Sequence, residues 1–540
     1  MSYINNQPDP DIERLISVID AGSDVLVIQN NAGYDPGASN HLINILYLHG
    51  ICVSVLARST ASTLNVLKSA SAIKNVEIYS GGRNYFQFLF FLLRRKYDAV
   101  ILYKTTNRIE HYLPHYLAYL ISRGAQKFII VDDKKTEAKI VSGKFFLRSN
   151  ALILSKLFLL VLQKPFIYIK NAATRTFCRY DPKRIRKILF VRLDHIGDAV
   201  MSLALVDILR SNFPSAAIHV LAAPWNFEIF HRDSRVDKVY SFSASWHNRK
   251  NDCFEERDLI GGFGLVAKNS QLINSLKSEG YDLAIDSRGD FFDSLMAYES
   301  GARFVIGSVG WFYNTMIFDN SFLLTHVVDY GDTMKHISAL HADIAEKLEC
   351  KFSRTQLIPN ILVSKSNQDN IRKIFGDLGI DISNLNKTNI AFQICAGEKS
   401  RQWPKKNFEE LALRIGKIYG NKVNLFFSGS SSEKNANQEV CEKLSSKGAF
   451  NVYNVAGTFS VANLPAFFKE MDLLITNDTG PMHIANAVGV KIIALFKGIF
   501  AQVHAPVGSN NVIISTKRDS DDMSTITVLE VIDVVTKSIK

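Results

Sequence analysis

Short apolar runs recur along the whole chain, and each is followed by a loop and then by a helical stretch. The runs DVLVIQ (24–29), ILFVR (188–192) and NIAFQ (389–393) have the length and branched composition of strands buried on both faces. Strands that alternate with helices predict parallel sheets with helices on either side. This repeated strand–helix cycle constrains the fold most, and it indicates an α/β protein with doubly wound sheets.

The cycle begins anew twice, and 540 residues are too many for a single hydrophobic core. We therefore expect several domains. They are an accessory Rossmann-like α/β domain over 1–145, an apolar and basic linker over 146–186, a Rossmann-like domain over 187–335, an interdomain helix and connection over 336–388, and a second such domain over 389–540. In the accessory domain, the runs CVSVLA (52–57), DAVILY (98–103) and KFIIVD (127–132) also predict strands.

Composition places the chain among soluble globular proteins, with 47% apolar and 21% charged residues. The six cysteines include no CxxC pair, which argues against a zinc site or a disulfide framework and fits a reducing compartment. The N-terminal residues have neither the basic region nor the apolar region of a secretory signal. We expect a cytoplasmic protein.

The net charge of +11 favours acidic partners, namely nucleic acid, an anionic membrane face or a phosphorylated glycolipid. The sequence contains no aromatic RNA-binding motif, helix-turn-helix signature or zinc finger to accompany this charge. We therefore expect no nucleic-acid partner.

Residues 151–169 are strongly apolar, but Lys156, Lys164 and Pro165 interrupt the run of about 20 residues that a membrane-spanning helix needs. Basic residues crowd the segment 170–187 that follows. This pattern fits a peripheral segment on the inner face of an anionic membrane, and equally a helix buried between domains. Residues 84–96 present the same two alternatives.

Three loops follow predicted strands, where doubly wound sheets bind their ligands. The first is RLDHIGD (192–198), in which Asp198 stands at a helix start. The positive end of the helix dipole favours an ionised carboxylate there, and such a group can accept a hydroxyl proton. A helix-capping role is the alternative.

The second loop, CAGEKSRQWPKKNF (395–408), contains Lys399 and Arg401, and a guanidinium can grip a diphosphate bidentately. A solvated charge run is the alternative. The third loop, NDTGPMHIANAVG (477–489), combines a Thr-Gly turn with a helix start, which is a favourable place for an anion. A capping Asp478 and a packed core His483 are the structural alternatives.

Taken together, five segments resemble the heptosyltransferases of glycosyltransferase family 9. They are ILFVRLDHIGDAVMSLALVDILRSNFP with IHVLAAP, YDLAIDSRGD, SGARFVIG, SRQWPKKNFEELA, and AGTFSVANLPAFFKEMDLLITNDTGPMHIANAVGVKIIALF. The resemblance covers about 187–515, in the order and spacing of the family.

The resemblance implies a GT-B fold, in which two Rossmann-like domains face each other across a cleft. It implies inverting sugar transfer, without a metal ion or other cofactor, from a sugar nucleotide, with ADP-linked heptose as the first candidate. The implied acceptor is a lipopolysaccharide core or a related glycolipid or oligosaccharide. By position, Asp198 matches the catalytic base. The matching donor-binding residues are Lys399, Arg401, Glu433, Asp478, Thr479, Gly480 and His483. The acceptor-side residues are Arg192, Gly197, Asp286 and Arg288.

Two positions depart from the family pattern. Lys497 stands where the family usually has glycine, and the segment after VNLFFSG, which contains Glu433, reads SSSEK. These differences leave the donor sugar and base open. There are two alternatives: a non-catalytic sugar-nucleotide-binding or scaffold protein of the same fold, and a sugar-nucleotide epimerase or hydrolase of the GT-B type. The N-terminal unit is similar instead to the first half of family 4 type glycosyltransferases. We expect it to bind the acceptor or act in docking, and a remnant domain with a purely structural role is the alternative.

Overall fold

The computed structural model describes six strands between residues 24 and 141 and most of the chain from 163 to 539. The later gaps are 248–264, 267, 310–319, 330–334, 383, 385, 449–450, 499 and 519–520. The apolar segment 84–96, the first part of the linker (146–162) and the loops of the accessory domain lie outside the described residues. Our expectations for these segments stay predictions.

The first sheet has the strand order β3-β2-β1-β4-β5-β6, which is the doubly wound order of Rossmann folds. Its strands are β1 (Asp24–Gln29), β2 (Cys52–Arg58), β3 (Ile73–Tyr79), β4 (Ala99–Lys104), β5 (Lys127–Asp132) and β6 (Ala138–Val141). All pairs are parallel except β5 with β6. The four runs predicted in this unit are β1, β2, β4 and β5.

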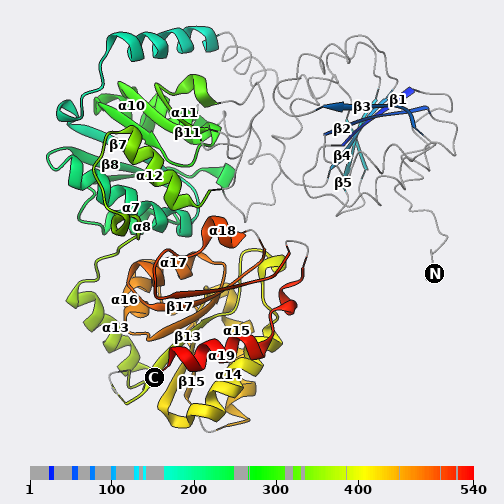
Figure 1. The fold of residues 1–540 in the computed structure, drawn as a ribbon, viewed down its shortest axis with the longest axis vertical. Coiled ribbons are helices and arrows are strands. Elements are labelled where there is room, and N and C mark those ends of the chain that lie inside the picture. The colour runs from blue at the N-terminus through cyan, green and yellow to red at the C-terminus, as the bar shows by residue number, and fades with distance from the viewer. Residues whose placement is uncertain are drawn as a thin grey trace. The chain divides into compact units, whose positions relative to one another are not determined.

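The second sheet repeats this order with six parallel strands. It lies among helices in Figure 1. Its strands are β7 (Lys187–Arg192), β8 (Ala217–Ala222), β9 (Lys238–Ser241), β10 (Leu283–Asp286), β11 (Phe304–Val309) and β12 (His326–Asp329). Its helices include α7 (Ile196–Asn212), α8 (Phe227–His231), α10 (Ser270–Ser278), α11 (Phe291–Glu299) and α12 (Ile337–Lys347). Helix α7 is apolar on nearly all sides and is therefore almost wholly buried.

The third sheet has the same order and is also entirely parallel. Its strands are β13 (Thr388–Gln393), β14 (Val423–Phe427), β15 (Asn451–Asn454), β16 (Leu473–Asn477), β17 (Lys491–Phe496) and β18 (Asn511–Ser515). Its helices include α13 (Lys365–Asp377), α14 (Lys405–Tyr419), α15 (Lys434–Ser445), α16 (Leu464–Lys469), α17 (Gly480–Ala487), α18 (Phe500–His504) and α19 (Val528–Ser538), with the short 3-10 helices η6 (Lys399–Arg401) and η8 (Ser431–Glu433).

Alternate residues of each central strand enter different cores, because successive side chains point to opposite faces. In β13, Ile390 and Phe392 pack with α14, α15 and α19, whereas Ala391 packs in the core that includes α16 and α17. The predicted α/β class, with doubly wound sheets, is confirmed.

A helix covers residues 163–177. Ile167 and Asn171 are buried, whereas Ile169 and Phe177 are 64% and 84% exposed. Across the described residues, no helix combines the length and the apolar character required to cross a bilayer.

Candidate active site

Four loops that follow neighbouring strands supply the candidate site. Strand β7 leads into residues 193–198 and β10 into 287–290, while β13 leads into 395–403 and β16 into 478–480. Strand β7 pairs with β10, and β13 pairs with β16. These are the central strands, where the strand order reverses and where such sheets bind ligands.

A buried ion-pair network joins the loop after β7 to the loop after β10. The fully buried Asp194 carboxylate accepts a hydrogen bond from Arg288 Nη1 at 2.8 Å and lies 3.1 Å from Arg192 Nε. Arg192 also donates to the backbone carbonyl of Asp198 at 3.0 Å and to Ser287 Oγ at 2.8 Å. Arg192 is only 1% exposed, so this predicted acceptor-side residue lies behind the loops and fixes their backbone.

Asp198 lies in the first turn of α7, close to Arg288. The capping position of α7 belongs to His195, so the capping alternative does not apply to Asp198. Arg288 Nη1 lies 3.9 Å from Asp198 Oδ2. Burial acts to raise the pKa of Asp198, but the charges of Arg192 and Arg288 outweigh burial and hold the pKa well below its ordinary range. The carboxylate is ionised at neutral pH and can accept a proton.

Asp286, at the end of β10, shapes the loop that carries Arg288. Its Oδ1 accepts the backbone N–H groups of Arg288 and Gly289 at 2.9 and 3.1 Å, and its Oδ2 accepts from Ser294 Oγ at 2.5 Å. Burial, reinforced by the nearby Asp293, raises the pKa of Asp286 to about 7. Because Asp286 is fully buried, the structure places it beneath the loop.

Arg401, in η6, is held by two carboxylates and one aromatic ring. Its Nη1 donates to Asp478 Oδ2 at 3.1 Å, and its Nε lies 3.4 Å from Glu398 Oε2. Its guanidinium lies 4.1 Å from the centre of the Phe500 ring, within the range of a cation–π interaction. The Arg401 side chain is 18% exposed and therefore is not part of a solvated charge run, whereas Lys399 is exposed.

Asn477, the last residue of β16, ties the second and third loops together. Its Nδ2 donates to the Ile394 carbonyl at 2.8 Å, and its Oδ1 accepts the Trp403 backbone N–H at 2.9 Å. Trp403 is buried and donates from Nε1 to the Ile526 carbonyl at 2.8 Å. These bonds hold the loop that carries Arg401 against the end of β16.

The first turn of α17 belongs to the third loop. Thr479 is its N-cap residue and Pro481 lies in its first turn, so Asp478 is not the cap. Burial raises the pKa of Asp478, although the charge of Arg401 opposes this effect. Asp478 is therefore available as a partner that orients Arg401.

Helices α7 and α17 begin against each other, which brings the predicted base and the predicted donor loop together. A Cβ atom added to Gly197 would lie 2.8 Å from His483 Cδ2 and 3.4 Å from Gly480 Cα. His483 is 3% exposed, and burial lowers its pKa to about 3. The imidazole of His483 is therefore neutral at physiological pH, packed against the start of α7.

Glu433 has a structural role that is visible in the geometry. It ends η8, and its Oε2 accepts the Ser430 backbone N–H at 2.6 Å in a capping box. Its predicted contact with the donor stays a prediction.

Sequence reasoning did not single out Asp194 or His504 as site residues. Asp194 lies within the first loop, and only the fold reveals that it pairs with Arg192 and Arg288. His504, at the end of α18, is near enough for its charge to influence the pKa values of Asp198 and Asp478. Nothing in its sequence neighbourhood signals this.

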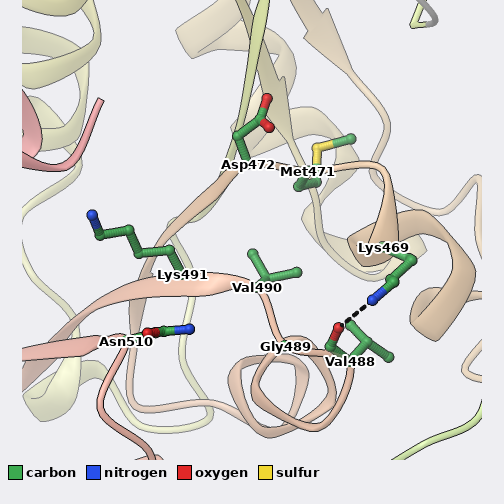
Figure 2. A pocket seen from close by; sticks show the side chains of 8 residues that line it. All are labelled: Lys469, Met471, Asp472, Val488, Gly489, Val490, Lys491 and Asn510. Carbon is green, nitrogen blue, oxygen red and sulfur yellow. Dashed lines mark hydrogen bonds between the residues drawn. The ribbon is translucent and has the colours of Figure 1, made fainter. Parts of the chain in front are cut away.

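A pocket of about 430 Å³ lies at the amino ends of strands in the third sheet, away from the carboxyl ends that carry the candidate site (Figure 2). Its walls come from the segments that precede β16 and β17, and the Lys469 ammonium donates to the Val488 carbonyl at 3.1 Å. Because ligands of parallel sheets bind at the carboxyl ends of strands, we do not include this pocket in the candidate site.

The family model of glycosyltransferase family 9 (heptosyltransferase) matches residues 270–530. This range includes Arg288, Arg401 and Asp478, and it begins after Asp198. The lipopolysaccharide core heptosyltransferase OpsX of Haemophilus influenzae is 27% identical over 321 residues, which are 58% of this chain and 79% of the relative. Lipopolysaccharide heptosyltransferase 2 of Salmonella typhimurium is 23% identical over 57% of this chain and 82% of its own length.

Solved structures share the fold. A glycosyl transferase family 9 structure from Veillonella parvula superposes with a TM-score of 0.54 and 18% identity, covering 65% of this chain and 97% of the other. The ADP-heptose lipopolysaccharide heptosyltransferase II of Escherichia coli gives a TM-score of 0.51, also at 18% identity, over 65% of this chain and 98% of the other. The predicted GT-B type of fold and the predicted resemblance to family 9 are confirmed. Residues 270–530 of this chain match glycosyltransferase family 9, the heptosyltransferase family, and the chain is a glycosyltransferase.

Proposed function

We propose that the chain transfers a sugar, with heptose from ADP-heptose as the first candidate, to a lipopolysaccharide core or related surface-glycan acceptor. The observation that carries this proposal is the contact between the α7 and α17 starts. It places the ionised Asp198 beside the loop of Asp478, whose carboxylate is hydrogen-bonded to Arg401 of the neighbouring loop.

In the proposed reaction, an acceptor hydroxyl gives its proton to the Asp198 carboxylate as its oxygen bonds to the anomeric carbon. The bond from that carbon to the diphosphate oxygen breaks, and its electron pair leaves with the nucleoside diphosphate. A single displacement from the opposite face inverts the anomeric centre.

The low pKa of Asp198 makes it a weak base while the site is empty of substrate. A bound diphosphate brings negative charge close to Arg288 and Arg401, and this charge raises the proton affinity of Asp198. Donor binding thus prepares the base for the acceptor.

The leaving diphosphate needs positive charge. We assign this task to Arg401, Lys399 and the backbone amides at the start of α17, where the helix dipole also favours an anion. These groups make a metal ion unnecessary in the proposal, so chelation should leave the rate unchanged.

The test uses the purified full chain with ADP-, UDP- and GDP-linked sugars, ADP-heptose included, with and without a core-lipopolysaccharide acceptor and with and without EDTA. We expect nucleoside diphosphate release that requires the acceptor and is insensitive to EDTA. Release that is equally fast without acceptor would establish a hydrolase or epimerase instead. Donor binding without any turnover would establish a binding protein.

We also propose that the helix over 163–177 docks the protein on the anionic inner face of the membrane. Ile169 and Phe177 are exposed apolar side chains, and Lys170 and Arg175 lie between them on the same helix. Apolar side chains next to cations suit an interfacial helix on anionic lipid.

Vesicle co-sedimentation tests this docking. We expect binding to phosphatidylglycerol vesicles that weakens with salt and falls at least fivefold in an Ile169→Ser, Phe177→Ser double variant. Leu529→Ser, which removes another exposed apolar side chain, is the control. Equal binding to neutral phosphatidylcholine vesicles would contradict the electrostatic part.

A further inference from the structure

Helix α18 carries His504 into the candidate site, and three contacts fix its position. Val503 packs in a small buried cluster with Met201 of α7 and Ile337 of α12. The carbonyl of Ala505 accepts a hydrogen bond from His336 Nε2 at 2.8 Å. At the other end of α18, the Phe500 ring lies 4.1 Å from the Arg401 guanidinium. The short helix is thereby anchored to both halves of the site.

Six charged or titratable groups lie near enough to His504 to interact with it electrostatically. These groups are Asp198 on α7, Arg288 after β10, His336 at the N-cap of α12, Arg401 on η6, Asp478 after β16 and His483 on α17. Burial lowers the pKa of His504, and Arg401 and Arg288 act in the same direction, whereas the two carboxylates oppose them. Without a ligand, the imidazole is therefore neutral at pH 7 and above.

The arginines of the site are already committed to carboxylates. Arg288 pairs with Asp194 at 2.8 Å, and Arg401 pairs with Asp478 at 3.1 Å. The positive charge that these arginines offer to a diphosphate is therefore partly neutralised. A nearby group that can become positively charged would strengthen diphosphate binding most.

Two other histidines near His504, His336 and His483, are poorly suited to supply that charge. His336 uses both ring nitrogens, with Nε2 donating to Ala505 and Nδ1 accepting the Ser338 backbone N–H at 3.1 Å. The pKa of the buried His483 lies near 3. His504, which is only partly buried, is the better candidate.

We infer that His504 is a donor-binding residue whose imidazolium contacts the diphosphate of the sugar nucleotide. This inference rests on the proposed function and extends it. The ring takes up a proton when the donor binds, and in the reaction it donates a hydrogen bond to the leaving diphosphate oxygen. The acceptor proton goes to Asp198, and the His504 proton returns to solvent when the nucleoside diphosphate departs.

Isothermal titration calorimetry with ADP, UDP and GDP tests the inference, at pH 8 in two buffers of different ionisation enthalpy. For the diphosphate that binds the wild type, we expect net proton uptake. His504→Gln should abolish that uptake and weaken binding about tenfold. His504→Arg should abolish uptake but retain most of the affinity, because its positive charge is permanent.

His231→Gln, at an exposed histidine of α8, is the matched control and should behave like the wild type. Wild-type affinity together with unchanged proton uptake in His504→Gln would overturn the inference while leaving the proposed function intact. If the wild type bound none of the three diphosphates and released none from the donor panel, the proposed function would fail and this inference with it.

Discussion

Gly197 and Gly480 meet where α7 and α17 begin: a Cβ atom added to Gly480 would lie 3.3 Å from the Gly197 backbone nitrogen. The contact joins the loop of the proposed base to the loop of the proposed donor site. A side chain at either position must displace its neighbour.

Gly197→Ala should therefore impair the enzyme. The new methyl group would lie 2.8 Å from the buried His483 ring and would push the two helix starts apart. We expect kcat/KM to fall at least tenfold, measured as acceptor-dependent diphosphate release. Gly376→Ala in α13 is the control, because its methyl group meets no described atom within 4 Å. Unchanged activity in Gly197→Ala would show that the close contact is unimportant.

Arg288→Met should move the pH dependence of the reaction. Arg288 helps to hold the pKa of Asp198 below its ordinary range, so its removal raises that pKa and the base protonates at higher pH. The acidic limb of the kcat/KM profile should move upward by about one pH unit or more. Arg414→Met, on the surface of α14, should leave the profile in place. An unchanged profile would show that Arg288 does not control the pKa of the catalytic base.

Asp286→Asn should stabilise the protein at alkaline pH. The folded-state pKa of Asp286, near 7, lies above its unfolded value, so the native state binds the extra proton. The stability that this carboxyl contributes is lost as pH rises from about 4 to about 7. The variant cannot ionise, and its Tm at pH 8 should exceed that of the wild type by roughly 5 °C, for a gain on the order of 2 kcal/mol.

Thermal unfolding followed from pH 5 to pH 9 measures this effect. The difference in Tm between variant and wild type should grow with pH and level off above pH 7. An equal difference at all pH values would mean that packing, and not ionisation, distinguishes the two proteins.

The central strands were predictable from the sequence because they are buried on both faces and appear as continuous apolar runs. Strand β5 matches its predicted run residue for residue, and β7 begins one residue early. Strands β3, β9 and β15, which lie at the edges of their sheets, are among those that were not predicted. In β9 and β15, every residue is partly exposed, so the apolar signal is weak.

The site was predictable as far as it follows strand ends. Asp198, Arg401 and Asp478 belong to the segments that follow such strands, and parallel strands bring their carboxyl ends to the same side of the sheet. Asp194 required knowledge of which arginines face it. His504 depends on Val503 packing against Met201, a contact between residues about 300 positions apart that no local pattern encodes.

The most direct test of the central claim is the rate of acceptor-dependent diphosphate release for Asp198→Asn, measured with saturating donor. Asparagine preserves the size of the side chain but cannot accept the proton, so we expect kcat to fall about a hundredfold or more while donor affinity stays within a few fold. Asp533→Asn, on the exposed face of α19, controls for the loss of a surface carboxylate. A wild-type kcat in Asp198→Asn would contradict the assignment of Asp198 as the base.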